Sequence, residues 1–383
     1  MTPFDYQPRT RIVFGPGQVD RLGELAGELG ARRALVVSDP GIVAAGHTAR
    51  GLAALERAGI ETHLFDGVAE NPTDLCVEAG VALARRHQPE MLVGLGGGSS
   101  MDCAKGINFV YSCRGRIQDY WGVGKALYPM LPMIAVPTTA GTGSETQSFA
   151  LITDSQTHVK MACGDKKASC RVAILDPTLS VTQPPRVTAL TGIDAVAHAL
   201  ETYVTNRRNA VSLAFSREAW QLLAENFGKV LADPADLEAR GGMLLGASFA
   251  GLAIENSMLG ATHALANPLT AHFGIVHGQA IGLMLPHVIR FNGVAVDGWY
   301  RELLEYVPST NGAARRPKAA EALAEVVADL AGRAGLPQKL SQCGVDEGKL
   351  AELAADAAKQ WTSEFNPRKV GAEECLGLYR QAW

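Results

Sequence analysis

The sequence predicts a fold in two parts, an α/β first half built on a parallel sheet and an all-helical second half. Up to about residue 175, short apolar runs alternate with longer helix-type segments, which is typical of a parallel sheet covered by helices on both faces. Beyond Pro184-Pro185 the chain has only long apolar periodic segments with short breaks, as expected of packed helices. A length of 383 residues also favours two domains, and we expect them to span residues 1–180 and 181–383.

Each strand of the first half is predicted from a compact apolar run bounded by turn or polar residues. The runs are residues 11–14, 34–38, 62–65, 90–95, 132–136 and 171–175. The helices between them are expected at about 18–29, 42–58, 73–87 and 99–109. The second half predicts helices at about 187–204, 209–231, 235–258, 260–272, 278–291, 298–307, 317–334, 347–360 and 371–380.

The composition excludes several classes of protein. Hydrophobic residues make up 47% and charged residues 19% of the chain, which fits a packed globular protein. A net charge of −4 without any basic run argues against a nucleic-acid partner. No signal-type N-terminus and no apolar run of membrane-spanning length is found. The seven scattered cysteines form no Cys-x-x-Cys pair, so we expect reduced thiols and a cytoplasmic location.

A run of glycines follows the fourth predicted strand and opens a helix, in Gly96-Gly97-Gly98-Ser99-Ser100-Met101-Asp102. Glycines allow a phosphate to approach the backbone closely, and the helix N-terminus offers unpaired N–H groups. The alternative is a tight strand-to-helix turn without a ligand. The pattern is neither the usual dinucleotide fingerprint nor a Walker loop.

Two further features suggest a dinucleotide. Asp39 follows the second strand, where a carboxylate can bind ribose hydroxyls and would repel a 2′-phosphate. This favours NAD over NADP, although Asp39 could equally be an ordinary turn residue. The loop Pro137–Thr146 combines small residues with several hydroxyls, which suits a pyrophosphate or ribose. Lys160 is a possible charge partner for a phosphate, or a solvated lysine.

Four residues of the helical half could hold a metal ion. Asp194 and His198 are four positions apart, which puts both side chains on one helix face. His263 and His277 lie in small, apolar surroundings further along the chain. Each histidine alone is more often a buried, hydrogen-bonded residue than a ligand. Together the four supply nitrogen and oxygen ligands that suit a divalent first-row metal. His272 and His287 are weaker candidates.

These motifs together resemble the iron-containing (group III) alcohol dehydrogenase family. The resemblance rests on Gly96–Asp102, Pro137–Glu145, Asp194-x-x-x-His198, His263 and His277-Gly278, in family order across nearly the whole chain. It implies a Rossmann-like dinucleotide-binding domain and a helical metal-binding domain, with the active site in the cleft between them. This is the architecture also found in dehydroquinate-synthase-like proteins.

The resemblance also implies the roles of individual residues. Asp194, His198, His263 and His277 would be the metal ligands, with iron expected and zinc possible. The cofactor-binding residues would be Asp39, Asn71, Gly97, Gly98, Ser99, Asp102, Thr138, Thr139, Thr142, Lys160 and Leu179. Family members commonly form homodimers or larger assemblies.

The chain departs from the family pattern at Asn267, where members often have a histidine facing the cofactor and substrate. Asparagine can hydrogen-bond but cannot take a proton near neutral pH, so a proton relay through this catalytic-site position is not expected.

The expected reaction is hydride transfer between a small primary alcohol or aldehyde and NAD(H), with the metal acting on the substrate oxygen. By analogy, an apolar pocket would draw on Phe149, Ile254, Met258 and Trp361-Thr362. Two enzyme alternatives remain: a glycerol-dehydrogenase-like polyol dehydrogenase and a dehydroquinate-synthase-like carbocyclase. The carbocyclase needs a basic pocket, and no Lys/Arg cluster lies near the histidine segments. A non-enzymatic NAD- or metal-binding protein is a third class.

Overall fold

The computed structural model describes residues 2–383, and the chain forms two compact units. The α/β unit comprises Gln7–Thr139 and Gly143–Gln183. The helical unit comprises Pro184–Trp383, the short segment Ala140–Thr142 and residues 2–6. Among residues 2–383, no helix is both long enough and apolar enough to cross a membrane.

The α/β unit is built on a six-stranded sheet in which every pair of neighbouring strands is parallel, as predicted. The strand order is β1-β9-β6-β4-β2-β3. Every residue of the central strands β4 and β6 is buried, which explains why these segments are continuously apolar in sequence. The strands are β1 (Arg11–Phe14), β2 (Arg33–Val37), β3 (Glu61–Phe65), β4 (Met91–Gly96), β6 (Met133–Pro137) and β9 (Val172–Leu175).

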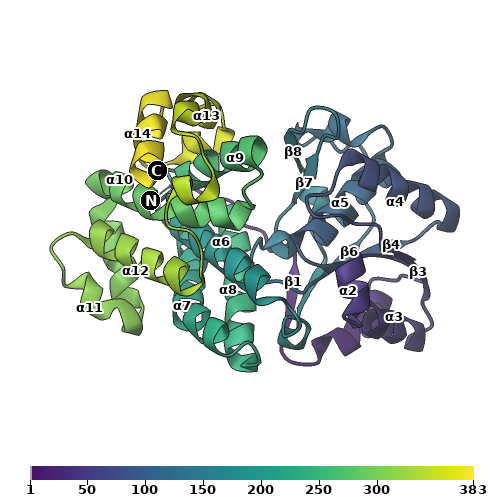
Figure 1. The fold of residues 1–383 in the computed structure, drawn as a ribbon. Helices are drawn as coiled ribbons and strands as arrows, with labels where there is room; N and C mark the ends of the chain where they lie inside the picture. The colour runs from purple at the N-terminus through teal and green to yellow at the C-terminus, as the bar shows by residue number, and fades with distance from the viewer. Residues whose placement is uncertain (1) are drawn as a thin grey trace. The chain divides into compact units, whose positions relative to one another are not determined.

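The two faces of this sheet are covered by different helices (Figure 1). Leu35 and Val37 point to one face and pack with residues of α4 (Asp74–His87) and α5 (Gly98–Cys113). Ala34 and Val36, the alternate residues of the same strand, pack on the other face with residues of α1 (Leu22–Glu28) and α3 (His47–Arg57). Alternate residues of β2 therefore contribute to the hydrophobic cores on both faces of the sheet.

Local details of this unit differ from the predicted elements. The helix expected at 42–58 is two helices, α2 (Pro40–Ala44) and α3, because Gly46 between them has a φ of 81°, which interrupts a helix. The helix expected at 18–29 begins as the 3₁₀ turn η1 (Gln18–Arg21). A small second sheet was not predicted. It consists of β5 (Gly122–Val123), β7 (Phe149–Thr153) and β8 (Lys160–Gly164) in the order β5-β8-β7.

The helical unit has no strand among its described residues, as predicted. Its central helix is α6 (Pro185–Val204), in which every residue from Gly192 to Val204 is buried. One difference from the prediction is α10, which spans both helices expected at 278–307 and has a non-helical Val296 at its kink. The other helices are α7 (Ala210–Ala232), α8 (Leu237–Glu255), α9 (Ala261–Phe273), α10 (His277–Tyr306), α11 (Asn311–Ala314), α12 (Ala319–Arg333), α13 (Leu350–Ala357) and α14 (Ala372–Ala382).

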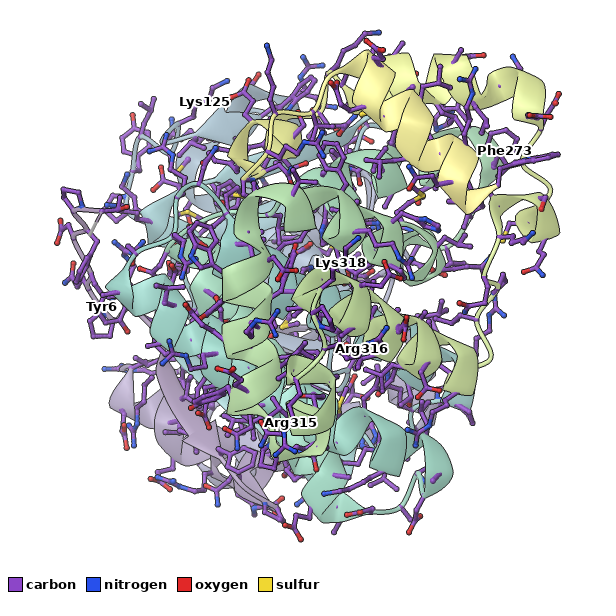
Figure 2. The ribbon with its side chains drawn as sticks, turned by 90° about the vertical axis from the view of Figure 1, so that its left-hand side faces the viewer. Tyr6, Lys125, Phe273, Arg315, Arg316 and Lys318 are labelled. Atoms are coloured by element: carbon purple, nitrogen blue, oxygen red, sulfur yellow. The ribbon has the colours of Figure 1, made fainter. Side chains whose placement is uncertain are left out.

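One connection between helices of the helical unit is exposed and basic. In Figure 2, Arg315, Arg316 and Lys318 extend from the connection between α11 and α12. The guanidinium of Arg316 pairs with Glu325 of α12. This exposed charge contrasts with the Gly192–Val204 part of α6, where every polar side chain is buried. Buried polar groups need hydrogen-bond or metal partners. The buried polar side chains of α6 form part of the candidate site.

Candidate active site

Helix α6 presents Asp194 and His198 one turn apart, as their spacing predicts. Both side chains are buried, with 6% and 5% of their residue surface exposed. The Nε2 atom of His198 lies 3.5 Å from Oδ1 of Asp194. Two polar groups that share one face of a buried helix are therefore directed at a common point.

Two histidines from other helices meet the same carboxylate. His263 lies in the first turn of α9, and its Nε2 is 3.4 Å from Asp194 Oδ1. His277 begins α10, and its Nε2 is 3.6 Å from the same oxygen. The ligand atoms of Asp194, His263 and His277 lie within 4.8 Å of one another, close enough to bind one metal ion. Residues 194, 263 and 277 thus meet although they are far apart in sequence.

His198 lies at the margin of this group. Its ring stacks on that of His263 with centroids 4.9 Å apart, and its Nε2 is near Asp194, but it is not in the compact set of three. The fourth predicted ligand is therefore adjacent to the other three.

The unsatisfied atoms of this cluster fit a metal ion. Asp194 Oδ1 and His263 Nε2 are buried and have no hydrogen-bond partner among the described residues. Leaving such atoms without a partner is costly. A carboxylate oxygen and imidazole nitrogens facing one point are the donors that a divalent first-row metal takes. The residues present therefore suit the metal that the family resemblance implies.

Burial and neighbouring charges shift the pKa values of the clustered residues. Burial acts to raise the pKa of Asp194, but the surrounding histidines outweigh it and lower the pKa. Burial acts to lower the pKa of His263, but the Glu201 and Asp194 carboxylates raise it to about 9. Burial lowers the pKa of His198. The Asp194 carboxylate therefore stays negatively charged and would attract a cation bound beside it.

Glu201 is a buried member of the site that sequence reasoning missed. Its Oε2 lies 2.5 Å from Nδ1 of His263, the ring nitrogen that faces away from Asp194. A carboxylate bonded to the far nitrogen is the usual orienting partner of a metal-binding histidine. The sequence did contain a signal, because Glu201 follows Asp194 by seven residues and His198 by three, on the same face of an apolar helix.

Asn267 lies one turn after His263 on α9, and its Nδ2 donates a 3.0 Å hydrogen bond to Oε1 of Gln360. Two amides therefore pair at the position where the family often has a histidine. Neither amide titrates near neutral pH.

In the α/β unit, several of the predicted nucleotide-binding residues gather at one edge of the sheet. Asp39 follows β2, the glycine run follows β4, and Thr138 and Thr139 follow β6. These three strands are neighbours in the sheet and parallel, so their carboxyl ends meet. Between β2 and β4 the strand order reverses, since β3 lies on the far side of β2. Such a switch point is where open α/β sheets bind ligands.

Asp39 and the glycine run are directly connected across this switch point. Oδ2 of Asp39 accepts a 3.0 Å hydrogen bond from Ser100 Oγ, and Oδ1 caps α2 at the Ile42 N–H. A Cβ on Gly96, whose φ is 152°, would lie 2.4 Å from Ser100 Oγ. Only glycine fits there. Gly97 is the N-cap of α5, with Gly98 and Ser99 in its first turn, as an anion site requires.

The threonines after β6 belong to different units: Thr138 and Thr139 to the α/β unit, and Thr142 to the helical unit. Thr138 is buried, and its Oγ1 has no hydrogen-bond partner among the described residues, which leaves it free for a ligand. The Thr139 side chain faces Gly97, where an added Cβ would lie 3.4 Å from its methyl group. Thr142 belongs to the compact helical unit.

The remaining predicted cofactor residues have varied environments. Asn71 donates its N–H to Ser99 Oγ at 3.3 Å and accepts from Lys160 Nζ at 3.3 Å. Asp102 is buried and accepts a 2.6 Å bond from Ser144 Oγ. Leu179 is 1% exposed and packs in the core beneath the sheet. The structure therefore joins Asn71 and Lys160 to the glycine run, while Leu179 lies in the interior.

A buried lysine supports this edge and was not predicted. Lys105 of α5 is fully buried, and its Nζ donates to the carbonyl oxygens of Ser144 and Phe149 and to Ser144 Oγ, at 2.6 to 2.9 Å. Ser144 in turn donates to Asp102. Lys105 therefore holds the segment after β6 against α5.

The α/β unit therefore has a parallel sheet with a candidate dinucleotide-binding edge, and the helical unit has an Asp/His cluster that fits a metal ion. Together these features define a class of metal- and dinucleotide-dependent enzyme. The family model for iron-containing alcohol dehydrogenase matches residues 8–177, and the model for the family's C-terminal region matches residues 188–383. The chain belongs to the iron-containing alcohol dehydrogenase family.

Individual relatives extend over the whole chain. The 1,3-propanediol dehydrogenase of Klebsiella pneumoniae is 35% identical over 382 residues, covering 99% of each chain. The NAD-dependent methanol dehydrogenase of Bacillus methanolicus is 34% identical, covering 100% of each. The crystal structure of a 1,3-propanediol oxidoreductase superposes with a TM-score of 0.94 at 34% identity, again covering 100% of each chain.

The predicted family and fold class are thereby confirmed. The chain is an alcohol–aldehyde oxidoreductase that uses a metal and a nicotinamide dinucleotide. The carbocyclase and polyol dehydrogenase alternatives are not favoured.

Proposed function

We propose that the chain oxidises a small primary alcohol, or reduces the aldehyde, at a metal held by Asp194, His198, His263 and His277, with NAD(H) as hydride partner. The observation that carries the proposal is the convergence of three imidazole Nε2 atoms on one carboxylate oxygen, at 3.4 to 3.6 Å. The names of the relatives, which act on 1,3-propanediol and methanol, support a small primary alcohol as the substrate.

Each residue of the helical site would have a defined task. Asp194 would supply the negative ligand atom, and the histidines would supply neutral nitrogens. A divalent metal bound there would polarise the substrate oxygen as a Lewis acid. Iron is the proposed metal because the family resemblance favours it, although this donor set also suits zinc. Burial of Asp194 and His263 would keep bulk water away from the charge.

The α/β edge would bind the dinucleotide, which supplies the hydride-accepting nicotinamide. Gly97, Gly98 and Ser99 would hold the pyrophosphate at the start of α5. Asp39 would bind the adenosine ribose and select NAD over NADP. Thr138, Thr139, Thr142, Lys160 and Asn71 would complete the contacts. Asp102 and Leu179 would support the cofactor site from the interior of the unit, because both are buried.

The substrate proton would leave without a titrating group at position 267. The Asn267–Gln360 pair can orient a hydroxyl or a water through its free amide atoms, but it cannot store a proton. Substrate oxygen and water would therefore carry the proton. This predicts that no ionisation of residue 267 shapes the pH profile of kcat.

Location, domain organisation and assembly are part of the proposal. All seven cysteines are free thiols, which supports a cytoplasmic, reducing environment. Residues 1–180 and 181–383 would be the cofactor-binding and metal-binding domains. The family resemblance supports a homodimer or larger homo-oligomer, which light scattering of the purified protein tests.

The decisive experiment combines metal analysis with turnover. The purified protein is reconstituted anaerobically with Fe²⁺, and NADH oxidation at 340 nm is followed with a panel of small aldehydes. His263→Ala and His277→Ala are expected to lose both bound iron and activity. An exposed histidine, altered as His158→Asn, is the matched control and should retain both. Full NADH-dependent aldehyde reduction by a metal-free variant would refute the proposal.

A further inference from the structure

The metal-facing histidine of α9 occupies an unusual place in its helix. His263 is in the first turn of α9, directly after Gly260, which has no side chain to cap the helix. The N–H groups of a helix's first turn have no partner within the helix. The caps of α9 must therefore come from other parts of the chain, and the position of His263 depends on them.

Glu201 of α6 supplies one of these caps and contacts the histidine as well. Its Oε1 accepts the N–H of Thr262 at 2.7 Å, while its Oε2 lies 2.5 Å from His263 Nδ1. Glu201 is 4% exposed, so both contacts are shielded from water. A carboxylate at a helix N-terminus is also favoured by the helix dipole. One side chain thus fixes both the start of the helix and the imidazole that the helix carries.

An amide pair provides the second cap. Asn366 Oδ1 accepts the N–H of Ala261 at 3.3 Å, and Asn366 exchanges hydrogen bonds with Asn292 of α10 at 2.8 and 3.0 Å. Both asparagines are buried. A Cβ at position 260 would lie 3.0 Å from Asn366 Oδ1 and 3.1 Å from Glu201 Oε1. Gly260 therefore gives both caps access to the helix end.

We propose that Glu201 is a positioning residue that orients His263 and selects its ligand-ready tautomer. A carboxylate accepts but does not donate, so it holds the proton of His263 on Nδ1. A metal that binds at Nε2 displaces any proton there, so this atom, which faces Asp194 Oδ1 at 3.4 Å and has no other partner among the described residues, presents its lone pair to the metal. The inference rests on the proposed metal site and adds the residue that prepares it.

The substitution Glu201→Gln separates the two contacts. Glutamine keeps a carbonyl oxygen for the Thr262 N–H, so the helix cap survives. Its NH₂ group can only donate to His263 Nδ1, which moves the imidazole proton to Nε2 and removes the lone pair from the metal. Glu201→Ala, by contrast, removes the cap as well as the orienting bond.

The test measures Co²⁺ binding by competition with a chromophoric chelator, together with the visible spectrum of bound Co²⁺ and the thermal unfolding midpoint. We expect Glu201→Gln to weaken Co²⁺ binding about 10- to 100-fold and to alter the ligand-field bands, with little change in the unfolding midpoint. Glu201→Ala should weaken binding and also lower the midpoint. Glu201→Asp should restore part of the affinity, because it is again an acceptor only.

A matched control removes a capping carboxylate elsewhere in the same unit. Asp236 caps α8 through the Ala239 N–H at 2.9 Å, and Asp236→Asn should leave Co²⁺ affinity unchanged. If Glu201→Gln binds Co²⁺ like the parent, or no worse than Asp236→Asn, the positioning role is wrong. If His263→Ala also binds Co²⁺ like the parent, the proposed metal site itself is wrong.

Discussion

Asp39 has two structural bonds and still retains capacity for a ligand. Its oxygens accept from Ile42 N–H and Ser100 Oγ, while an ionised carboxylate offers about four acceptor positions. The turn interpretation and the ribose interpretation of this residue are therefore compatible.

Asp39→Gly is expected to shift cofactor preference toward NADP, because it removes the charge that repels a 2′-phosphate. We expect the ratio of kcat/KM for NADP to that for NAD to rise at least about tenfold, equivalent to about 1.4 kcal/mol. Asp39→Asn, which keeps the cap of α2, should show the same direction at lower cost in stability. An unchanged ratio in both variants would remove Asp39 from cofactor selection.

His287 of α10 is expected to contribute to a loss of stability in acid. Burial, with a smaller effect of Arg290, lowers the pKa of His287 from 6.5 to about 4. Between these values the unfolded chain binds a proton that the folded chain does not, so stability falls as pH drops from about 6.5 toward 4. His287→Gln should reduce this loss by an amount of order 1 kcal/mol, after allowance for partial exposure.

The measurement compares urea unfolding at pH 7 and pH 5. His158→Asn, in the exposed turn between β7 and β8, serves as control and should leave the acid loss unchanged. Equal losses in the parent and in His287→Gln would exclude His287 as the acid-sensitive group.

At the scale of elements, three helices bring the metal-facing atoms together, and their packing is tight. Gly278 follows His277 at the start of α10, and a Cβ there would lie 2.1 Å from the backbone oxygen of Leu190 in α6. A backbone atom cannot move aside as a flexible side chain can. The close approach of α10 to α6 therefore sets the position of His277 relative to Asp194.

Gly278→Ala is expected to push the start of α10 away from α6. We expect a loss of about 1–3 kcal/mol in unfolding free energy and weaker Co²⁺ binding, because His277 moves with the helix. Gly298→Ala on the same helix is the control. Among residues 2–383, nothing lies within 4 Å of its added Cβ, so stability should rise by about 0.5–1 kcal/mol. Parent-like Co²⁺ binding by Gly278→Ala would show that this contact does not position the ligand.

At the element scale the sequence predicted most of the structure. The strands of the large sheet and the helices of the second half follow from apolar runs and helical periodicity. The sheet β5-β8-β7 was not predicted, because β5 has only two residues and β7 and β8 form an antiparallel pair outside the strand–helix alternation on which the prediction rested. Lys105 was missed for a related reason, since a lysine with no visible partner in sequence is usually on the surface.

For the whole molecule, the two proposed sites belong to separate compact units. Except for Thr142, every predicted nucleotide-binding residue lies in the α/β unit, and all four predicted metal ligands lie in the helical unit. Each unit has its own helices and buried core. Binding of one ligand is therefore expected to persist without the other.

Removal of metal by a chelator should abolish turnover but leave NADH binding, followed by its fluorescence, within about threefold of that of the loaded protein. Re-addition of Co²⁺ at about 100 times its Kd should stabilise the fold by about 2.7 kcal/mol, measured as a higher unfolding midpoint. His263→Ala, treated in the same way, should show no such gain. Loss of NADH binding on chelation would instead show that the cofactor site depends on the metal.

Several features could be predicted from the sequence alone because they depend only on local chemistry. Strand–helix alternation, the glycine run after a buried strand and the i, i+4 spacing of Asp194 and His198 follow from backbone sterics and helical geometry, which act over a few residues. Tertiary structure decided what depends on distant parts of the chain. It placed three imidazoles around one carboxylate oxygen, paired Glu201 with a histidine 62 positions away, and joined Asn267 to Gln360. Spacing on α6 indicates that Glu201 shares a face with Asp194, but the partners of Glu201 and Asn267 are set only when separate helices pack together.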